Sequence, residues 1–249
     1  MKPAFVFLIP ALLGAGPAQQ LLDNKMSLPQ RAAACLELRG HADPDAVSAL
    51  VHALQNPDLL TCAAEDLRVA GATEPLQRAL TSDNFQLRAA AARELGVLQR
   101  PELLEPLARA AQDENVLVAS NALAGLSQYR DPAVIPYLTN LARTGGMTGD
   151  MALDRLSQLD STAAVGVARG LLGSLQVPDR LYAMRILGAS GDRSDLPALQ
   201  KIVASQPETL AQRDRGFGFM PAINLARAAR EAIAAIEARE PASAHPAAP

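Results

Sequence analysis

One short pattern returns along this chain at a nearly constant interval, and it limits the available folds more than any other feature. Six segments end in Leu and a seventh in Ile, the first six are 28 to 31 residues apart, and each has Ala four positions earlier. The alanines are Ala34, Ala63, Ala91, Ala122, Ala152, Ala183 and Ala229, and the large residues are Leu38, Leu67, Leu95, Leu126, Leu156, Leu187 and Ile233. In an α-helix, positions i and i+4 share a face. Because alanine is small, the pattern predicts helices that approach one another closely.

Each repeat contains two helical patterns. Its first half carries apolar residues at helical spacing, such as Leu103, Leu104 and Leu107, and its second half ends at the large residue defined above. Turns between repeats contain helix-start residues, as at 43–44 and 131–132, where Asp precedes Pro. No segment keeps the alternation typical of a strand. We therefore predict an all-α solenoid of about six stacked, antiparallel helix pairs, with a core built from Ala and Leu because aromatic residues make up only 3%.

A family resemblance follows from the segments AARELGVLQRPELLEPL at 91–107 and AMRILGASGDRSDLPAL at 183–199. This framework resembles the short HEAT-type repeat, especially the form named after phycobilin lyase HEAT-like repeats. The Arg that often opens the second helix of such repeats has counterparts at Arg88 and Arg180, seven positions before Leu95 and Leu187. The resemblance covers roughly residues 28–237. It implies an α-solenoid and says little about function, because the repeat is reused widely.

The first residues have the pattern of a cleaved secretory signal. Met1 and Lys2 precede an apolar stretch at 4–13, and small residues follow up to Ala18. We expect a signal peptide at 1–18, a capping helix region at 19–40, the HEAT-like solenoid at 41–238 and a disordered Pro/Ala-rich tail at 239–249. The protein would then be periplasmic or secreted, and an uncleaved anchor is the competing interpretation. No membrane span is expected in the mature chain.

Charge and motifs favour no catalytic or cofactor site. The formal net charge is −3, which gives no electrostatic reason to expect nucleic acid or an anionic membrane as a partner. His41, His52 and His245 belong to no recognisable nucleophilic triad, and His41 with Asp43 is explained more simply by acids at a helix start than by a metal. The Gly-rich segment 143–150 lacks the Lys of a phosphate loop and is predicted to be a flexible turn between helices. We expect no catalytic, metal or cofactor residues.

The chain has two cysteines, Cys35 and Cys62, on neighbouring second helices. An even cysteine count in an exported protein suggests a disulfide. Helix axes usually lie 8–10 Å apart, whereas a disulfide needs Cα atoms nearer 5.5–6 Å. Two cysteines packed in an apolar interface are the alternative, and the sequence leaves both open.

A partner-binding surface is expected on the second helices, which line the concave side of HEAT-type stacks. Positions two and five before each large residue should point out of the stack, as Ala90, Arg93, Asn121, Ala124, Met151, Asp154, Tyr182 and Arg185 do in four repeats. A long segment at 206–221 interrupts the last repeat. The candidate binding residues are Arg93, Asn121, Tyr182, Arg185, Arg213, Arg215, Phe217 and Phe219. The competing interpretation is an ordinary solvated face.

These observations favour a non-enzymatic, exported scaffold that binds a protein or peptide through its concave face. A bilin lyase-like or chaperone-like subunit is one alternative, suggested by the resemblance, and a structural component of the cell envelope is another. The sequence leaves the oligomeric state open.

Overall fold

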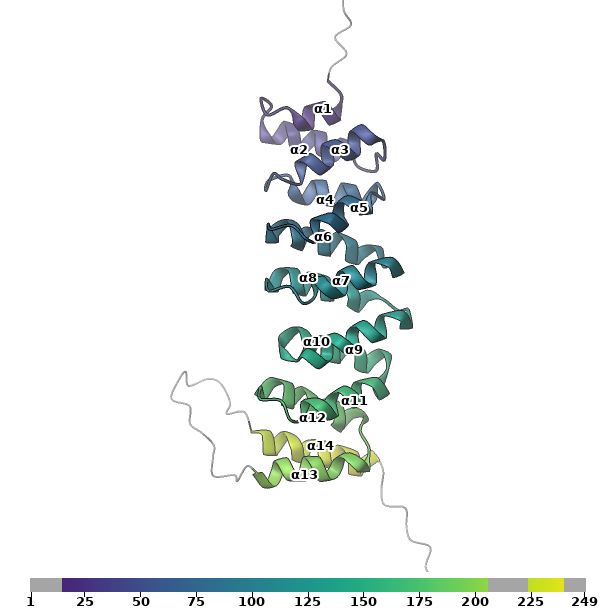
Figure 1. The fold of residues 1–249 in the computed structure, drawn as a ribbon, viewed down its shortest axis with the longest axis vertical. Coiled ribbons are helices and arrows are strands. Elements are labelled where there is room, and N and C mark those ends of the chain that lie inside the picture. The colour runs from purple at the N-terminus through teal and green to yellow at the C-terminus, as the bar shows by residue number, and fades with distance from the viewer. Residues whose placement is uncertain (1–14, 206–223, 240–249) are drawn as a thin grey trace, which may run out of the picture. The chain divides into compact units, whose positions relative to one another are not determined.

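The protein is an all-α solenoid. The computed structural model describes residues 15–205 and 224–239, and within these ranges it contains fourteen α-helices, three short 3-10 helices and no strand (Figure 1). The segment 206–221, with Arg213, Arg215, Phe217 and Phe219, lies outside the described residues, as do most of the expected signal peptide and tail. The predicted fold class is confirmed.

The chain forms two compact units, residues 1–98 and residues 99–249. The first unit contains α1 (Pro17–Leu22), α2 (Leu28–Glu37), α3 (Pro44–Ala53), α4 (Leu60–Val69), α5 (Thr73–Ala79) and α6 (Phe85–Leu98). These helices form three consecutive pairs, and the second helices contact one another in the order α2, α4, α6. Because α1 also contacts α3, both layers of the stack are continuous at its first two pairs.

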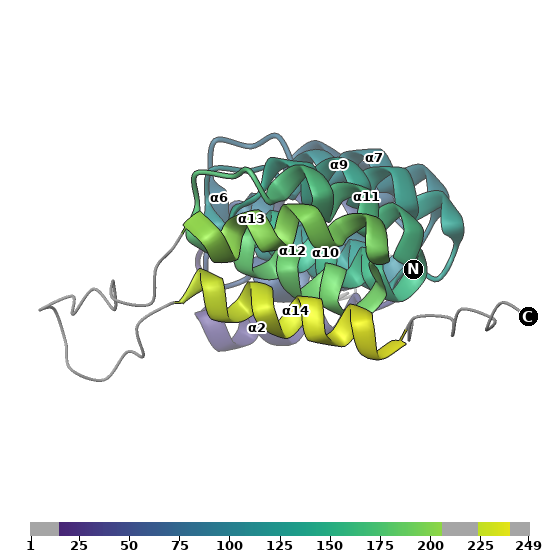
Figure 2. The ribbon, with the colours of Figure 1, turned by 90° about the horizontal axis from the view of Figure 1, so that it is seen from below.

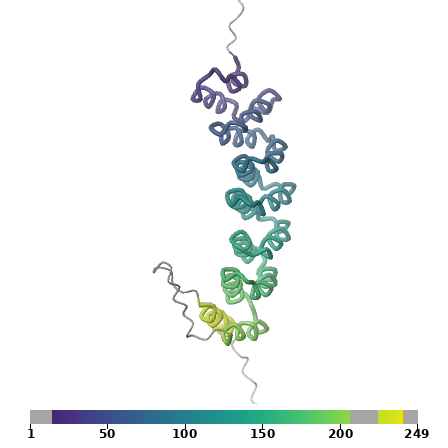
Figure 3. Tube along the Cα trace, turned by 60° about the vertical axis from the view of Figure 1, so that its left-hand side comes forward, coloured from purple at the N-terminus to yellow at the C-terminus, as the bar shows by residue number. Residues whose placement is uncertain are grey.

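The described part of the second unit contains four further helix pairs of the same kind. It contains η1 (Pro101–Leu103), α7 (Leu104–Ala110), α8 (Val116–Gln128), η2 (Pro132–Val134), α9 (Ile135–Thr144), α10 (Gly146–Leu159), α11 (Ser161–Leu171), α12 (Val177–Ser190), η3 (Arg193–Asp195), α13 (Leu196–Ser205) and α14 (Leu225–Arg239). The second helices α8, α10, α12 and α14 contact in that order, and α7, α9 and α11 form the other layer. Figure 3 shows the pairs following one another along the trace of this unit, and Figure 2 shows α13 beside α14.

The repeated alanines lie at the contacts between helices, as predicted. All seven are at most 1% exposed, and the first six large residues that follow them are at most 2% exposed. The seventh assignment is wrong, because Ile233 is only half-buried, whereas Ile236 is fully buried. Ala232, four positions before Ile236, is also buried, so the alanine rule holds in α14 with its register moved by three residues.

Gly188 shows why small residues are needed along this stack. It lies in α12, and a Cβ atom added there would come within 3.1 Å of the Cα atom of Ala232 in α14. Backbone atoms cannot move aside as a flexible side chain can. The glycine that follows Leu187 therefore lets the last two second helices of the unit pack closely.

Capping interactions confirm the helix-start interpretation of the turns. The Asp43 carboxylate accepts a hydrogen bond from the Ala46 backbone N–H at 3.0 Å, and Pro44 occupies the first turn of α3. Asp131 caps η2 in the same way, because its carboxylate accepts from the Ala133 N–H at 2.8 Å. Asp43 therefore serves as a helix cap, with His41 Nδ1 3.6 Å from its other carboxylate oxygen.

The Gly-rich segment is a tighter turn than predicted. Helix α9 ends at Thr144 and α10 begins at Gly146, so most of the segment 143–150 is helical. Gly145 and Gly146 both have φ of 67°, a value that favours glycine, and they reverse the chain within two residues. Gly149 completes the close packing, because a Cβ there would lie 3.1 Å from the Leu141 carbonyl oxygen.

The predicted cleavage site of the signal peptide falls inside a helix of the first unit. Ala18, the predicted last residue of the signal peptide, lies inside α1, and α1 packs against α2 and α3. Within the described residues, no helix has the length and apolar character needed to cross a membrane.

Candidate functional site

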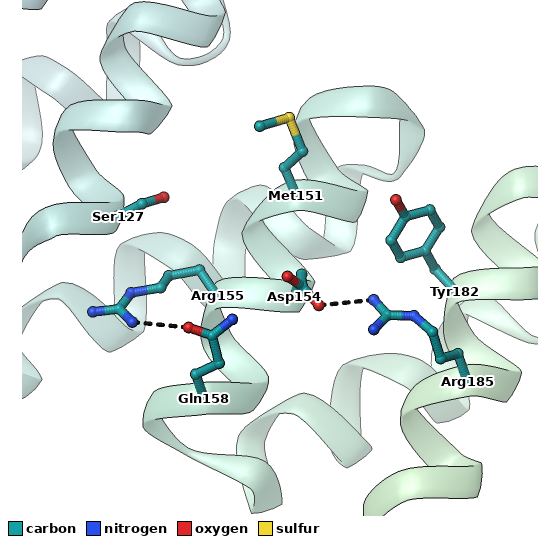
Figure 4. A pocket seen from close by; sticks show the side chains of 7 residues that line it. All are labelled: Ser127, Met151, Asp154, Arg155, Gln158, Tyr182 and Arg185. Carbon is teal, nitrogen blue, oxygen red and sulfur yellow. Dashed lines mark hydrogen bonds and ion pairs between the residues drawn. The ribbon is translucent and has the colours of Figure 1, made fainter.

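The second unit has a surface hollow along three successive second helices, α8, α10 and α12. Its volume is about 540 Å³ (Figure 4). We call it the second-unit hollow. Its lining consists of Ser127, Met151, Asp154, Arg155, Gln158, Tyr182 and Arg185. Four of these come from α10, at positions i, i+3, i+4 and i+7, which place them on one face of that helix.

One wall of the hollow is a group of three interacting side chains. The Arg185 guanidinium on α12 donates to the Asp154 carboxylate on α10 at 2.8 Å. The same guanidinium lies over the Tyr182 ring, with its carbon 4.9 Å from the ring centre. The Arg185 and Asp154 side chains remain 54% and 45% exposed. The group is therefore ordered by its own contacts and still accessible to a partner.

The opposite wall is formed by Arg155 and Gln158. Arg155 donates to the Gln158 side-chain oxygen at 3.0 Å and to the Tyr129 carbonyl at 3.1 Å. Tyr129 is itself buried, and its hydroxyl donates to the Arg100 carbonyl at 2.9 Å. Burial raises the pKa of the Tyr129 phenol to about 12, so the ring stays neutral. The Arg155 guanidinium is thus anchored to the backbone carbonyl of a buried residue.

Met151 adds an apolar element between the two polar walls. Its side chain is 47% exposed at the start of the α10 face, and Figure 4 shows it apart from the ion pair. A flexible thioether of this kind adapts to differently shaped partners. The hollow therefore combines an aromatic ring, a thioether, two guanidinium groups, a carboxylate and an amide.

The structure brings some predicted residues together and separates others. Tyr182 and Arg185 line the second-unit hollow. Asn121 lies half-buried in α8 and is not among the lining residues. Arg93 belongs to α6 of the first unit, where it donates to Glu94 at 2.8 Å. The outward position expected for Ala90 is wrong, because Ala90 is buried in α6, which packs against α4 and α5.

Three lining residues were missed from the sequence. Ser127, Arg155 and Gln158 do not fall two or five positions before a repeat leucine. Arg155 and Gln158 lie four and seven positions after Met151, so helical spacing counted from Met151 would have found both. Ser127 follows directly after Leu126 and carries no signal of its own.

Two buried carboxylates lie near the N-terminal ends of α10 and α12. Asp179 on α12 accepts hydrogen bonds from the Gly146 N–H and the Ser174 hydroxyl, at 2.8 and 2.7 Å. Asp150 on α10 is 4% exposed, and its Oδ1 atom has no hydrogen-bond partner. Burial, together with the nearby Asp179 charge, raises the pKa of Asp150 to about 6. Asp179 therefore holds the α9–α10 turn against α12.

A second cluster lies in the first unit, between α2 and α4. A disulfide joins Cys35 and Cys62, whose Cα atoms are 6.5 Å apart. The Asp66 Oδ2 atom lies 3.6 Å from the Cys35 sulfur and 3.3 Å from the Cys62 sulfur. These three residues form a group with the ligand types of a metal site. A cation would require two separate thiolates, which the disulfide does not provide.

The cluster extends what the sequence indicated. The sequence indicated the two cysteines as a candidate pair but did not single out Asp66. It lies four positions after Cys62 on the same helix, which is the signal that could have included it. Asp66 is 1% exposed, and burial raises its pKa to about 6.

Comparisons with known proteins agree with this architecture. Residues 73–146 match a family model described as HEAT repeats. A sequence comparison with functionally described proteins found no match.

Among solved structures, human deoxyhypusine hydroxylase is 21% identical, with 89% of this chain and 95% of that chain covered and a TM-score of 0.39. The complex of CpcE and CpcF of phycocyanin lyase from Nostoc sp. is 20% identical, with 94% and 100% covered and a TM-score of 0.41. A designed armadillo repeat protein in complex with a (KR)4 peptide is 16% identical, with 90% and 100% covered and a TM-score of 0.37.

The match of residues 73–146 to HEAT repeats confirms the sequence-based resemblance at the level of the repeat. The narrower likeness to the phycobilin lyase form stays a prediction. The chain therefore contains HEAT-like repeats at 73–146, with further helix pairs on both sides of the matched segment.

Proposed function

We propose that this protein is an exported, non-enzymatic scaffold that binds a peptide segment of a protein partner along the second helices of its second unit. The observation that carries this proposal is the second-unit hollow, which three adjacent helices line with accessible side chains. The resemblance to HEAT-type stacks implies that the second helices line the concave side. An extended segment lying across α8, α10 and α12 would contact all of them.

The side chains in the hollow suit a peptide of mixed polarity. Arginine and tyrosine dominate binding hot spots, and Tyr182 is held in place by Arg185. Gln158 and Ser127 supply an amide and a hydroxyl that can bond to a peptide backbone. Asp154 and Arg185 neutralise each other, whereas Arg155 bonds only to neutral groups, so the hollow carries one net positive charge.

The same lining argues for binding rather than catalysis. Among its seven residues there is no histidine or cysteine, and its one carboxylate is engaged by Arg185. A general base or nucleophile needs a partner that activates it, and the lining of the hollow supplies none.

A peptide-display selection on the full chain tests the proposal. Peptides selected by immobilised protein should bind with a Kd that rises at least about tenfold when Tyr182→Ala and Arg185→Ala are combined, because each hot-spot side chain contributes about 1–2 kcal/mol or more. Arg109→Ala is the matched control, because Arg109 is an exposed arginine of the same unit on α7. Equal affinity of the double variant and the wild type would refute the assignment of this face.

Purification from the native cell tests the two remaining parts of the proposal. The exported form should begin at Gln19, as shown by the mass of its N-terminal peptide. A protein that retains residues 1–18 would contradict cleavage after Ala18. A purified protein that carries a pigment absorbing visible light would replace the scaffold proposal with bilin handling.

A further inference from the structure

The disulfide of the first unit lies against a carboxylate that the fold leaves incompletely paired. Asp66 is buried between α2 and α4, with Oδ2 facing both sulfurs and Oδ1 without a hydrogen-bond partner. Burying a carboxylate in this way costs free energy. A cystine that only joined two helices would gain nothing from such a neighbour, because a disulfide has no proton to donate.

The arginines near Asp66 do not resolve this cost. Arg39 pairs with Glu65, and Arg68 donates to Glu94 at 2.7 Å. Their charges lower the pKa of Asp66 less than burial raises it, and Glu65 adds to the rise. Asp66 therefore retains a proton up to a pH of about 6, well above the usual range of an aspartate.

The two sulfurs differ in accessibility. Cys35 is fully buried, whereas Cys62 is half-buried on the first turn of α4. Thiol–disulfide exchange begins when a thiolate attacks one sulfur and the other sulfur departs. Access therefore directs attack to Cys62 and makes Cys35 the leaving group.

The buried leaving group needs a proton. A thiolate formed at Cys35 has no access to water and is costly in an apolar interface. The Asp66 Oδ2 atom, 3.6 Å from that sulfur, is placed to supply the proton. A carboxylic acid can do so, whereas the amide of asparagine cannot.

Beyond the scaffold role, we propose that Cys35 and Cys62 form an exchange-active disulfide, which oxidises thiol substrates stoichiometrically, with Asp66 as the proton donor. The substrate thiolate attacks Cys62 Sγ, the bond between the two cysteines breaks, and its electron pair goes to Cys35 Sγ. The Asp66 carboxyl protonates Cys35. A second substrate thiolate then attacks the substrate sulfur of the mixed disulfide and releases the substrate disulfide, and the Cys62 thiolate takes a proton from water. The Asp66 carboxylate then regains a proton from water, which has received the two protons of the substrate thiols. Overall, two thiols become one disulfide and the protein gains two thiol groups.

The rate of reduction by glutathione tests the role of Asp66. The oxidised full chain is mixed with glutathione, and free protein thiols are alkylated and counted by mass at successive times. Asp66→Asn should slow the reaction about tenfold or more, since proton transfer by a placed side chain contributes at least about a hundredfold in many enzymes. Asp58→Asn is the control, because Asp58 is an exposed aspartate before the same helix. An unchanged rate in a folded Asp66→Asn variant would overturn the proposal.

Adduct mapping provides a second test that needs only the wild-type protein. The mixed disulfide trapped early in the reaction should carry glutathione on Cys62, and an adduct on Cys35 would overturn the order of attack. A cysteine-containing peptide, used in a parallel reaction, separates the two thiol sources. Faster reaction of the peptide identifies protein cysteines as substrates, and faster reaction of glutathione identifies small thiols. A disulfide that neither thiol reduces while the protein stays folded would refute exchange altogether.

Discussion

In the described part of each unit, a buried aspartate lacks a full set of hydrogen bonds, and the two sites differ in their neighbours. In the first unit, Asp66 faces two sulfur atoms. In the second unit, Asp150 lies near another buried carboxylate, Asp179. Burial raises the pKa of Asp66 and of Asp150 to about 6. The same desolvation therefore gives both acids the same preference for the protonated form.

The atoms near each aspartate determine the chemical consequence of its raised pKa. A sulfur that becomes a thiolate can accept the proton of Asp66, so the first site can take part in chemistry. Asp179 is already fixed by the Gly146 N–H and the Ser174 hydroxyl, so the second site determines how two helices meet. Asp66 and Asp150 therefore both have a raised pKa, and only their contacts distinguish the reactive candidate, Asp66, from the structural one, Asp150.

The largest expected effect is on the stability of the first unit. Replacing both cysteines, Cys35→Ala with Cys62→Ala, should lower its free energy of unfolding by about 3–4 kcal/mol, because the cross-link spans 27 residues and restricts the unfolded chain. Urea unfolding followed by circular dichroism measures the change. The second unit contains no cysteine and provides the internal control. An unchanged transition would show that the cross-link does not stabilise this unit.

A smaller loss is expected at the turn that Asp179 holds. Gly145→Ala should destabilise the second unit by about 2–3 kcal/mol, since a positive φ costs about 1–2 kcal/mol and the added Cβ meets the Asp179 carboxylate. Gly146→Ala is the matched control, because Gly146 has the same φ of 67° with open space around it. Thermal unfolding of the two variants isolates the contact with Asp179. Equal losses would mean that this contact is unimportant.

Asp150→Asn should change the pH dependence of the second unit. Because the folded pKa of Asp150 is raised, its contribution to stability is present below pH 4 and is lost as the pH rises through about 6. The variant should match the wild type near pH 4 and exceed it by about 1–3 kcal/mol at pH 8. Denaturant unfolding across this range measures the difference.

The control for this prediction is Glu114→Gln, a change at an exposed acid of the same unit. It should leave the pH profile unaltered. A second-unit profile that is the same with Asp and with Asn at position 150 would contradict the buried-charge argument.

The sequence predicts the fold from a local rule but predicts the sites only in part. Alanine at i−4 marks helix contacts because close packing acts on single positions, and the rule failed only in register at Ile233, after the long interruption of the last repeat. The hollow is formed jointly by the second helices of three successive repeats. Tyr182 and Arg185 were found through their repeat positions, and helical spacing from Met151 could have added Arg155, but its hydrogen bond to the Tyr129 carbonyl is a contact between repeats that no local pattern reveals.

Asp66 could not be predicted for a related reason. As a residue of α4 it looks like one of many helix acids, and its burial follows from the packing of α2 against α4. Which flank of α4 faces α2 depends on the hand and spacing of the stack. Composition and periodicity leave both undetermined.

The smallest expected effect is on stability, and it differs between an ion pair of the first unit and one of the second. Glu94 in the first unit is 5% exposed and accepts from Arg68 at 2.7 Å, whereas Arg185 and Asp154 in the second unit are about half exposed. Exposed pairs contribute at most about 1 kcal/mol, whereas removing Arg68 leaves the buried Glu94 carboxylate with Arg93 as its remaining partner, which costs more. Arg185→Ala should therefore lower stability by less than about 1 kcal/mol, and Arg68→Ala by clearly more.

The small stability loss expected for Arg185→Ala makes its effect on peptide binding interpretable. If Arg185→Ala leaves the unfolding curve almost unchanged and still weakens peptide binding, the loss arises at the binding surface and not from unfolding. A double-mutant cycle with Asp154→Ala gives the coupling energy of the pair. A coupling above about 2 kcal/mol would show that Arg185 mainly joins α10 to α12, and its conformation would then be explained by the fold alone.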